Sequence, residues 1–573
     1  MYAAGNAGSL LGLLVYPLLI QPRLTLSEQT HLWAVLYVAF VALCMLCAVI
    51  ARRARADQAG RIVATAAPLT WRQRARWVVL AFIPSSLLVG STTHMTTDIA
   101  PIPLLWVVPL AVYLLTFIFA FSARPPVSTR AAGRVLPFVV VAAALAEPWM
   151  ISVPLWLTLI VPPALLFFAA MLAHGRLAGE RPPTERLTEF YFLLALGGVL
   201  GSSFNAFLAT KLFSSLIEYP LVIGVALVLR EGARRSAKAR PFQILRDVAI
   251  GTASMLTVVL LGFTIGAPTK AVLATAVVGS LVFYAKPIRF AFALGLLLVL
   301  MSARGGLYVE RDFYGQLIVR EGADHLHVLN SGTTVHGLQW FDRRRDEPLG
   351  YYTRSGPIGQ VFDKLQRRRP FRDVGVVGLG VGTLAAYGRS GQHLTFIEID
   401  PADVAIAQNP EWFTFLRDTK ATASVIVGDG RLELDRIPDE SYDLLTLDAF
   451  SSDSIPVHLI TREAIALEMR KVRPRGALAF HISNHFLELE PVFAAAARDL
   501  GFAGVAQDDT HVTAAQKEAG KIASHWVVLA RHADDISPLL ADPRWHRFAR
   551  TGDRAWTDDY SNVAGAFDWQ MSR

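Results

Sequence analysis

The stretch that decides the fold is "VGVVGLGVGTLAAYG", residues 374–388. An apolar run leads into three alternating glycines, Gly378, Gly380 and Gly382. Glycines after a buried strand permit a tight turn in which backbone N–H groups approach a ligand closely. We therefore predict a strand, a glycine turn and a helix that begins with "GTLAAYGR", residues 382–389. A glycine-rich helix contact inside a bilayer is the alternative.

The segments after this turn alternate between strand-like and helix-like apolar patterns. Strands are expected at "HLTFIEID", "ASVIVGDG", "SYDLLTLDAF" and "GALAFHIS", and helices at "PADVAIAQ" and "TREAIALEMRKV". This alternation predicts a doubly wound, Rossmann-like α/β domain over residues 371–573. Residues 303–370 alternate apolar and polar side chains, with turns at "EGAD" and "NSG", and are predicted to form a small region of antiparallel strands.

The chain before residue 303 has the composition of a membrane protein. Of 573 residues, 53 % are hydrophobic and only 18 % are charged, and the charges are sparse up to about Met301. About ten or eleven apolar runs approach the length that crosses a hydrocarbon core of roughly 30 Å. They lie near residues 8–21, 31–50, 77–93, 103–121, 135–150, 153–173, 188–208, 216–229, 247–266, 271–285 and 288–302. We predict a polytopic transmembrane domain over residues 1–302. The glycine stretch lies outside it, among charged segments, so the bilayer alternative for that stretch fails.

Basic residues account for the formal net charge of +8. They cluster in loops such as "ARRARADQAGR" and "REGARRSAKAR" that flank apolar runs, as the positive-inside rule describes, which favours a lipid bilayer over nucleic acid as partner. We expect a multi-pass protein of the bacterial inner membrane with a cytoplasmic soluble domain, if residues 247–302 cross twice rather than three times. Cys44 and Cys47 lie in an apolar run and are expected to pack rather than bind metal. Whether the protein forms a homodimer is not decided by the sequence.

Acidic residues follow the predicted strands. Glu398 lies in "FIEID", Asp429 lies in "GDGR", and Asp448 and Asp453 lie in "LDAFSSD". The carboxyl ends of parallel strands meet at one edge of a sheet, where nucleotide ligands bind. A carboxylate about 20 residues after the glycine turn can accept both ribose hydroxyls, which assigns that role to Glu398. The dinucleotide pattern G-x-G-x-x-G is not met, and a second acid, Asp429, suits an adenine amino group.

The order "VGLGVGT", "IEID", "VGDGR", "YDLLTLDAF", "DSIPVHLIT" resembles the spermidine synthase (aminopropyltransferase) family. With "SGTTVHGLQ", "HISNHFLEL" and "WTDDYSN", the chain is more closely similar to bacterial membrane proteins in which a spermidine-synthase-like domain follows a polytopic segment. The resemblance covers essentially the whole chain. It implies a membrane-bound transferase that acts on S-adenosylmethionine or its decarboxylated form and releases methylthioadenosine, with an amine or nucleoside as small-molecule substrate.

The resemblance also implies residue roles. The nucleoside-binding set is Gln339, Gly378, Gly380, Gly382, Glu398, Asp429 and Gly430, and the reacting set is Tyr352, Asp448 and Asp453. Asp448 matches the family's catalytic aspartate, which accepts a proton from the attacking amine or orients it. The sulfonium donor carries its own activation, so no metal is expected.

Two departures from the family pattern leave the substrates open. Val381 occupies the position at which the family has an aspartate that binds the donor's amine. Tyr352–Thr353–Arg354 occupies the position of the family's Tyr-His-Glu stretch. An arginine suits a carboxylate, so S-adenosylmethionine with its carboxylate intact is an alternative donor.

Three other reactions or roles also stay open. They are cleavage of the donor's own side chain, a methyltransferase that releases S-adenosylhomocysteine, and a transporter or sensor with a nucleoside-binding domain. His458 and His481 are expected to be satisfied by hydrogen bonds rather than catalytic, and Asp558 and Asp559 to form a turn.

Overall fold

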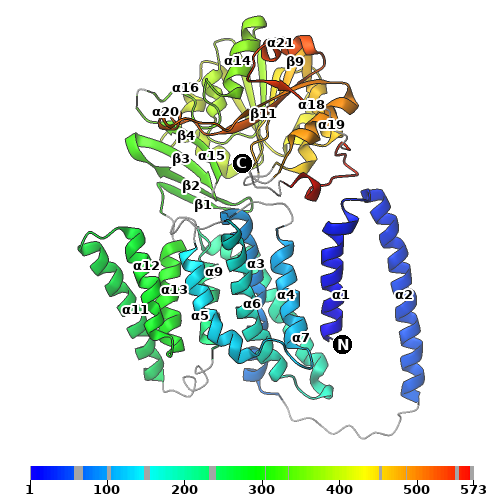
Figure 1. Ribbon diagram of the computed structural model, residues 1–573, viewed down its shortest axis with the longest axis vertical. Helices are drawn as coiled ribbons and strands as arrows, with labels where there is room; N and C mark the ends of the chain where they lie inside the picture. The colour runs from blue at the N-terminus through cyan, green and yellow to red at the C-terminus, as the bar shows by residue number, and fades with distance from the viewer. Residues whose placement is uncertain are drawn as a thin grey trace. The chain divides into compact units, whose positions relative to one another are not determined.

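The computed structural model describes most of the chain, as two compact units (Figure 1). The described residues are 2–56, 69–99, 105–146, 155–230, 241–302, 305–332, 334–342, 344–450, 455–484, 487–548 and 554–567. The first unit consists of Met1–Pro17, Ser27–Ile99 and Leu104–Arg304, and the second of Leu18–Leu26, Ala100–Pro103 and Gly305–Arg573.

The first unit is helical. Its longer helices are α1 (Tyr2–Val15), α2 (Leu26–Ala56), α3 (Trp71–Thr93), α4 (Val107–Ala120), α5 (Thr129–Leu145), α6 (Leu155–Gly179), α7 (Leu187–Ser203), α9 (Glu218–Val228), α11 (Pro241–Thr264), α12 (Thr269–Gly279) and α13 (Pro287–Ser302). Within the described residues, six helical segments are long and apolar enough to cross a membrane, judged by length and composition. Large apolar side chains such as Trp33, Tyr37 and Phe40 are exposed along α2.

A small antiparallel sheet opens the second unit, where the alternating pattern predicts strands. It consists of β1 (Tyr308–Arg311), β2 (Gln316–Glu321), β3 (Leu326–Ser331) and β4 (Thr334–Trp340), paired in that order. The pairing of β3 with β4 shifts register between Leu329 and Asn330. A shift of this kind changes which side chains of a strand face the neighbouring layer.

The large sheet is mixed, with strand order β12-β10-β11-β9-β8-β5-β6-β7. Its parallel part holds β5 (Asp373–Val377), β6 (His393–Glu398), β7 (Thr422–Val427), β8 (Tyr442–Leu447) and β9 (Val472–His481). The strands β10 (Ala503–Asp509), β11 (Ser524–Ala530) and β12 (His546–Arg547) extend it antiparallel at one edge. Every residue of β8 is buried, as expected for a central strand covered on both faces.

Helices cover both faces of this sheet (Figure 1). The helices α14 (Pro357–Arg368) and α15 (Pro401–Gln408) pack in the apolar cluster that contains Val376. The helices α17 (Gly430–Arg436), α18 (Arg462–Lys471) and α19 (Glu490–Leu500) pack in the cluster that contains its neighbour Val377. The two-residue period of β5 therefore assigns one side chain to each core, which confirms the Rossmann-like α/β architecture.

The prediction that an α-helix begins at Gly382 is wrong. The chain forms only a short 3₁₀ helix there, η7 (Thr383–Tyr387), and then leaves it at Gly388. The carbonyl of Ala385 accepts the N–H of Gly388 at 3.0 Å and the hydroxyl of Thr419 at 2.7 Å. An α-helix would need that carbonyl for the amide four residues on, so the side chain of Thr419 helps end the helix early.

Candidate active site

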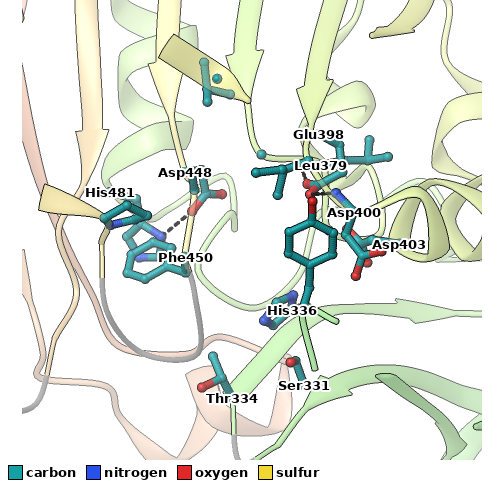
Figure 2. Close-up of a pocket in the computed structure, with 18 of the residues that line it drawn as sticks. Ser331, Thr334, His336, Leu379, Glu398, Asp400, Asp403, Asp448, Phe450 and His481 are labelled. Atoms are coloured by element: carbon teal, nitrogen blue, oxygen red, sulfur yellow. Dashed lines mark hydrogen bonds and ion pairs between the residues drawn. The ribbon is translucent and has the colours of Figure 1, made fainter. Parts of the chain in front are cut away.

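A cavity of about 260 Å³ lies at the carboxyl ends of the parallel strands. Residues that follow β5, β6, β7, β8 and β9 line one side of it, and residues of the small sheet and of Tyr351–Tyr352 line the rest. Figure 2 shows Asp448, His481 and Phe450 on one side of this cavity and Glu398, Asp400 and Asp403 on the other. The sheet edge predicted to bind a nucleotide is therefore a cavity of small-molecule size.

The glycine turn closes the cavity at the end of β5. Gly378 has φ +97°, and its N–H donates to the carbonyl of Ile397 at 2.8 Å. A Cβ on Gly378 would meet the backbone carbonyl of Asp448, and a Cβ on Gly380, which has φ +51°, would meet the carbonyl of His336. Only glycine fits both the conformation and the space, so the backbone of the turn reaches the cavity directly.

Glu398 holds this turn from the next strand. Its carboxylate accepts the N–H of Leu379 at 2.9 Å with one oxygen and the N–H of Asp400 at 2.9 Å with the other. Burial raises the pKa of the Glu398 carboxyl, while these backbone N–H groups act in the opposite direction. The carboxylate is fixed in place and lines the cavity.

Two further carboxyl groups lie beside Glu398. Burial, together with a hydrogen bond to Asp312, raises the pKa of Asp400 to about 7. Burial and the charges of Glu398 and Asp400 raise the pKa of Asp403 well above its usual value. Asp403 is 4 % exposed, and its Oδ1 has no hydrogen-bond partner within the protein. A buried acceptor without a partner is costly, which makes this oxygen a place where a ligand donor would gain free energy.

Asp448 occupies the opposite side of the cavity, at the end of β8. Its Oδ1 lies 2.7 Å from Nδ1 of His481, and the hydroxyl of Tyr352 donates to its carboxylate. Burial, followed by the charge of Asp448 and this hydrogen bond, raises the pKa of Tyr352 well above its ordinary value. The phenol therefore stays protonated and keeps donating at neutral pH.

Asp429 and Gly430 line the cavity at the end of β7. One oxygen of Asp429 caps α17 by accepting the N–H of Leu432 at 3.0 Å, and the other lies 3.2 Å from Nε2 of His458. His458 also lines the cavity. The two side chains form one polar pair at this end of the cavity. A nucleobase bound by Asp429 would therefore also meet His458.

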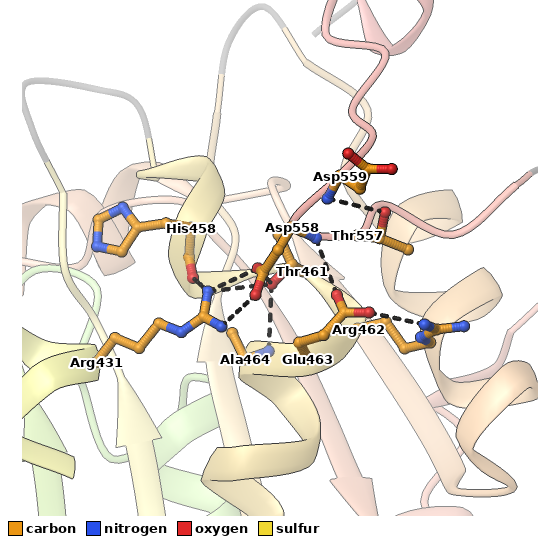
Figure 3. A network of polar contacts seen from close by, with 9 residues as sticks. All are labelled: Arg431, His458, Thr461, Arg462, Glu463, Ala464, Thr557, Asp558 and Asp559. Carbon is orange, nitrogen blue, oxygen red and sulfur yellow. Dashed lines mark hydrogen bonds and ion pairs between the residues drawn. The ribbon is translucent and has the colours of Figure 1, made fainter. Parts of the chain in front are cut away.

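A polar network behind this pair secures the C-terminal part of the chain (Figure 3). Arg431 follows Gly430 and makes two bonds to Asp558, at 2.7 and 2.6 Å, and a third to the carbonyl of His458 at 2.9 Å. The hydroxyl of Thr461 donates to Asp558 at 2.7 Å. Residues 557–560 form the expected turn, and their ion pair with Arg431 ties that turn to the rim of the cavity.

The structure brings together most of the residues predicted for the site. Seven line the cavity: Tyr352, Gly378, Gly380, Glu398, Asp429, Gly430 and Asp448. Gln339 and Gly382 lie outside its lining. The amide of Gln339 is fully buried and bonds to the backbone N–H and hydroxyl of Thr414 at 2.7 and 2.8 Å. Asp453 lies outside the described residues.

Other residues of the lining were not predicted from the sequence, among them His336, Asp400, Asp403 and Ser483. His481, which also lines the cavity, was expected to have only a structural role. Burial lowers the pKa of His336 to about 4, although the charge of Asp448 acts in the opposite direction, so the ring is neutral at pH 7. Its Nε2 has no partner within the protein. His336 precedes Gln339 by three residues on β4. Both lie in "SGTTVHGLQ", the stretch of sequence that could have indicated His336 as a residue of the cavity. The described residues hold no group of three His, Cys, Asp or Glu side chains arranged to bind a metal ion.

Comparison with known proteins finds two kinds of relative for parts of this chain. No family model matches the chain. It is 26 % identical over 190 residues to a polyamine aminopropyltransferase of Vibrio vulnificus, covering 31 % of this chain, and 29 % identical over 143 residues to a putative O-methyltransferase of Mycolicibacterium vanbaalenii, covering 24 % of it. The chain spans 59 % of the length of each of these relatives. It is thus a homologue of spermidine synthases, at low identity and over part of its length.

Solved structures of spermidine synthases also match. A probable spermidine synthase from Corynebacterium glutamicum matches with a TM-score of 0.35 and 15 % identity, covering 45 % of this chain and 98 % of the other. The enzyme from Thermotoga maritima matches with a TM-score of 0.29 and 12 % identity, covering 46 % and 83 %.

Proposed function

We propose that the chain is a membrane-bound transferase of the aminopropyltransferase type whose donor is decarboxylated S-adenosylmethionine. The nucleoside would lie against the glycine turn, with Glu398 at its ribose and Asp429 at its adenine. The observation that carries the choice of donor is the charge of the cavity. Within the described part of the chain, five carboxyl groups line it, those of Glu398, Asp400, Asp403, Asp429 and Asp448.

Among the described residues of the lining, none is a lysine or an arginine. A carboxylate on the donor would meet carboxyl groups and no lysine or arginine there, whereas a sulfonium and an ammonium would each meet an acid whose ionised form they stabilise. Arg354, which on sequence alone favours a donor carboxylate, ion-pairs with Glu347 at 3.1 Å, is half exposed and lies outside the lining. The carboxyl-rich lining supports the decarboxylated donor over S-adenosylmethionine itself.

The proposed reaction forms one bond and breaks one. The nitrogen of an acceptor amine attacks the carbon next to the sulfonium, the carbon–sulfur bond breaks, and sulfur keeps the electron pair, which leaves 5′-methylthioadenosine. The attacking nitrogen must first give up a proton, and the carboxylate of Asp448 lies at the cavity wall to receive or direct it. Positioning of the two substrates supplies much of the acceleration, because the donor is already activated.

Donor selection gives a direct test of the proposal. We expect the full chain in detergent to bind decarboxylated S-adenosylmethionine at least about tenfold more tightly than S-adenosylmethionine, and Asp403→Asn to reduce that ratio. A bound cation lowers the pKa values of the neighbouring carboxyl groups Glu398, Asp400 and Asp403, so binding should release protons. Calorimetry in two buffers of different ionisation enthalpy measures both quantities.

The matched control is Asp499→Asn, which removes an acid from an exposed pair with Arg498 and should leave the ratio unchanged. Tighter binding of S-adenosylmethionine by the unaltered chain would contradict the proposed donor. A methyltransferase would show that preference, and the O-methyltransferase relative keeps it as the second candidate.

We further propose that residues 1–302 form a polytopic domain of the bacterial inner membrane, residues 303–370 a small β-region, and residues 371–573 the catalytic domain, on the cytoplasmic side. The long apolar helices and the basic loops between them support this. Protease added to inverted membrane vesicles should cleave the catalytic domain, while protease added to intact spheroplasts should not. Cleavage only in spheroplasts would place the domain outside.

A further inference from the structure

His481 forms a continuous hydrogen-bonded chain with Asp448 and Ser483. Nδ1 of its ring lies 2.7 Å from Oδ1 of Asp448, and Nε2 lies 2.7 Å from Oγ of Ser483. The backbone N–H of His525 donates to the same Oγ at 2.8 Å. Because Ser483 already accepts that N–H, its own proton is available to Nε2, and Nδ1 then carries the ring proton and donates it to Asp448.

The surroundings of the ring favour a positive charge on it. Trp526 stacks on His481 with ring centroids 4.6 Å apart and planes 11° from parallel. Tyr351 and Phe450 lie against it at centroid distances of 5.0 and 4.9 Å. Aromatic faces attract cations, and the carboxylate of Asp448 pairs with an imidazolium directly.

Among the residues that the structure describes, few titratable groups face the ring. They are Asp448 at the end of β8 and the phenols of Tyr351 and Tyr352, the second of which has its ring centroid 6.3 Å away. Burial keeps the phenol of Tyr352 protonated at pH 7, and Asp448 is the one carboxyl group among these three. A proton delivered to Nε2 would therefore produce an ion pair in an aromatic enclosure.

We propose that Ser483, His481 and Asp448 form a proton relay in which His481 holds the proton removed from the acceptor amine. This rests on the proposed transfer. The amine gives its proton to Oγ of Ser483, which lines the cavity, while the hydroxyl proton of Ser483 passes to Nε2 of His481. The new carbon–nitrogen bond forms as the carbon–sulfur bond breaks. The positive charge lost from the sulfonium is matched by the charge gained on the imidazolium.

The chemistry favours an imidazole for this task over a carboxylate alone. A general base works best when its pKa is near the operating pH, and an ordinary imidazole titrates at about 6.5 against about 3.9 for an aspartate. Asp448 would then hold the ring in the correct tautomer and balance its charge, as a carboxylate does for a catalytic histidine in hydrolases. The serine gives the buried ring access to the cavity.

Kinetics of two variants test the relay. We expect His481→Gln to lower kcat by about 10²-fold or more, with donor affinity within about twofold by calorimetry, and to abolish the rise of kcat with pH through the imidazole range. Ser483→Ala should lower kcat by about tenfold and keep donor affinity. His546→Gln, which alters an exposed histidine paired with Glu490, is the matched control and should leave kcat unchanged. A His481→Gln enzyme that keeps the same pH inflection would overturn the proposal.

A second measurement separates this inference from the proposed function. In protein labelled with ¹⁵N-histidine, His481 is assigned by the signal lost in His481→Gln. We expect the neutral Nδ1–H tautomer at high pH, and a changed titration in Asp448→Asn. An Nε2–H tautomer would overturn the relay even if methylthioadenosine is formed. If no methylthioadenosine is formed, the proposed function fails, and the tautomer still decides whether this proton path exists.

Discussion

Replacement of Asp448 by asparagine is expected to lower turnover by about 10²–10⁴-fold while leaving donor affinity within a few-fold. The amide has nearly the shape of the carboxylate but cannot accept a proton or balance an imidazolium on His481. It also loses one of the two acceptors that bind Tyr352 and His481. Release of methylthioadenosine measured by mass spectrometry gives the turnover, and calorimetry gives the donor affinity.

A matched control separates this effect from a general loss of acidic charge. Asp439→Asn removes a half-exposed carboxylate that pairs with Lys471, away from the cavity, and should change neither quantity. If Asp448→Asn turns over at the same rate as the unaltered chain, the carboxylate has no part in the chemistry.

Replacement of Gly378 by alanine is expected to abolish donor binding, with a loss of at least about 100-fold, and to destabilise the second unit by about 3 kcal/mol. The residue has φ +97°, and a Cβ there would meet the backbone carbonyl of Asp448. The added methyl group must therefore move either the glycine turn or the end of β8, and both line the cavity. Thermal unfolding of the full chain and donor affinity by calorimetry measure the two effects.

Gly391→Ala is a close control, because it isolates the conformational cost from the clash. Gly391 has φ +85°, and a Cβ on it would have nothing within 4 Å. Alanine there should cost only about 1 kcal/mol of conformational strain and leave donor binding unchanged. Equal losses for the two variants would contradict the role given to the glycine turn.

The parallel part of the sheet could be predicted because its signals are local. Apolar runs marked the strands, and Asp400–Pro401, an N-cap followed by a proline at the first helical position, marked the start of α15. The early end of η7 could not be predicted, since it depends on Thr419, which is distant in sequence and takes the carbonyl of Ala385. The antiparallel edge formed by β10 and β11 also went unpredicted, because their pairing joins segments without a short turn between them.

The residues of the site also divide into those that local sequence signals predict and those that depend on contacts between distant segments. Glu398 and Asp448 could be predicted to lie together at the cavity because residues after parallel strands must meet at one edge. His336 could not be separated from Gln339, because which of them faces the cavity depends on the packing of the small sheet and on the register shift between Leu329 and Asn330. Asp403 lies within α15 rather than at a strand end, and its importance comes from burial and a missing partner, which no sequence pattern reveals.

The nature of the nucleoside product tests the central claim most directly. The full chain in detergent is incubated with a short aliphatic diamine and with either decarboxylated S-adenosylmethionine or S-adenosylmethionine, and the nucleosides are identified by mass spectrometry. We expect 5′-methylthioadenosine from the decarboxylated donor, at a rate that Asp448→Asn lowers by about 10²–10⁴-fold. Formation of S-adenosylhomocysteine from S-adenosylmethionine, with no methylthioadenosine from either donor, would contradict it.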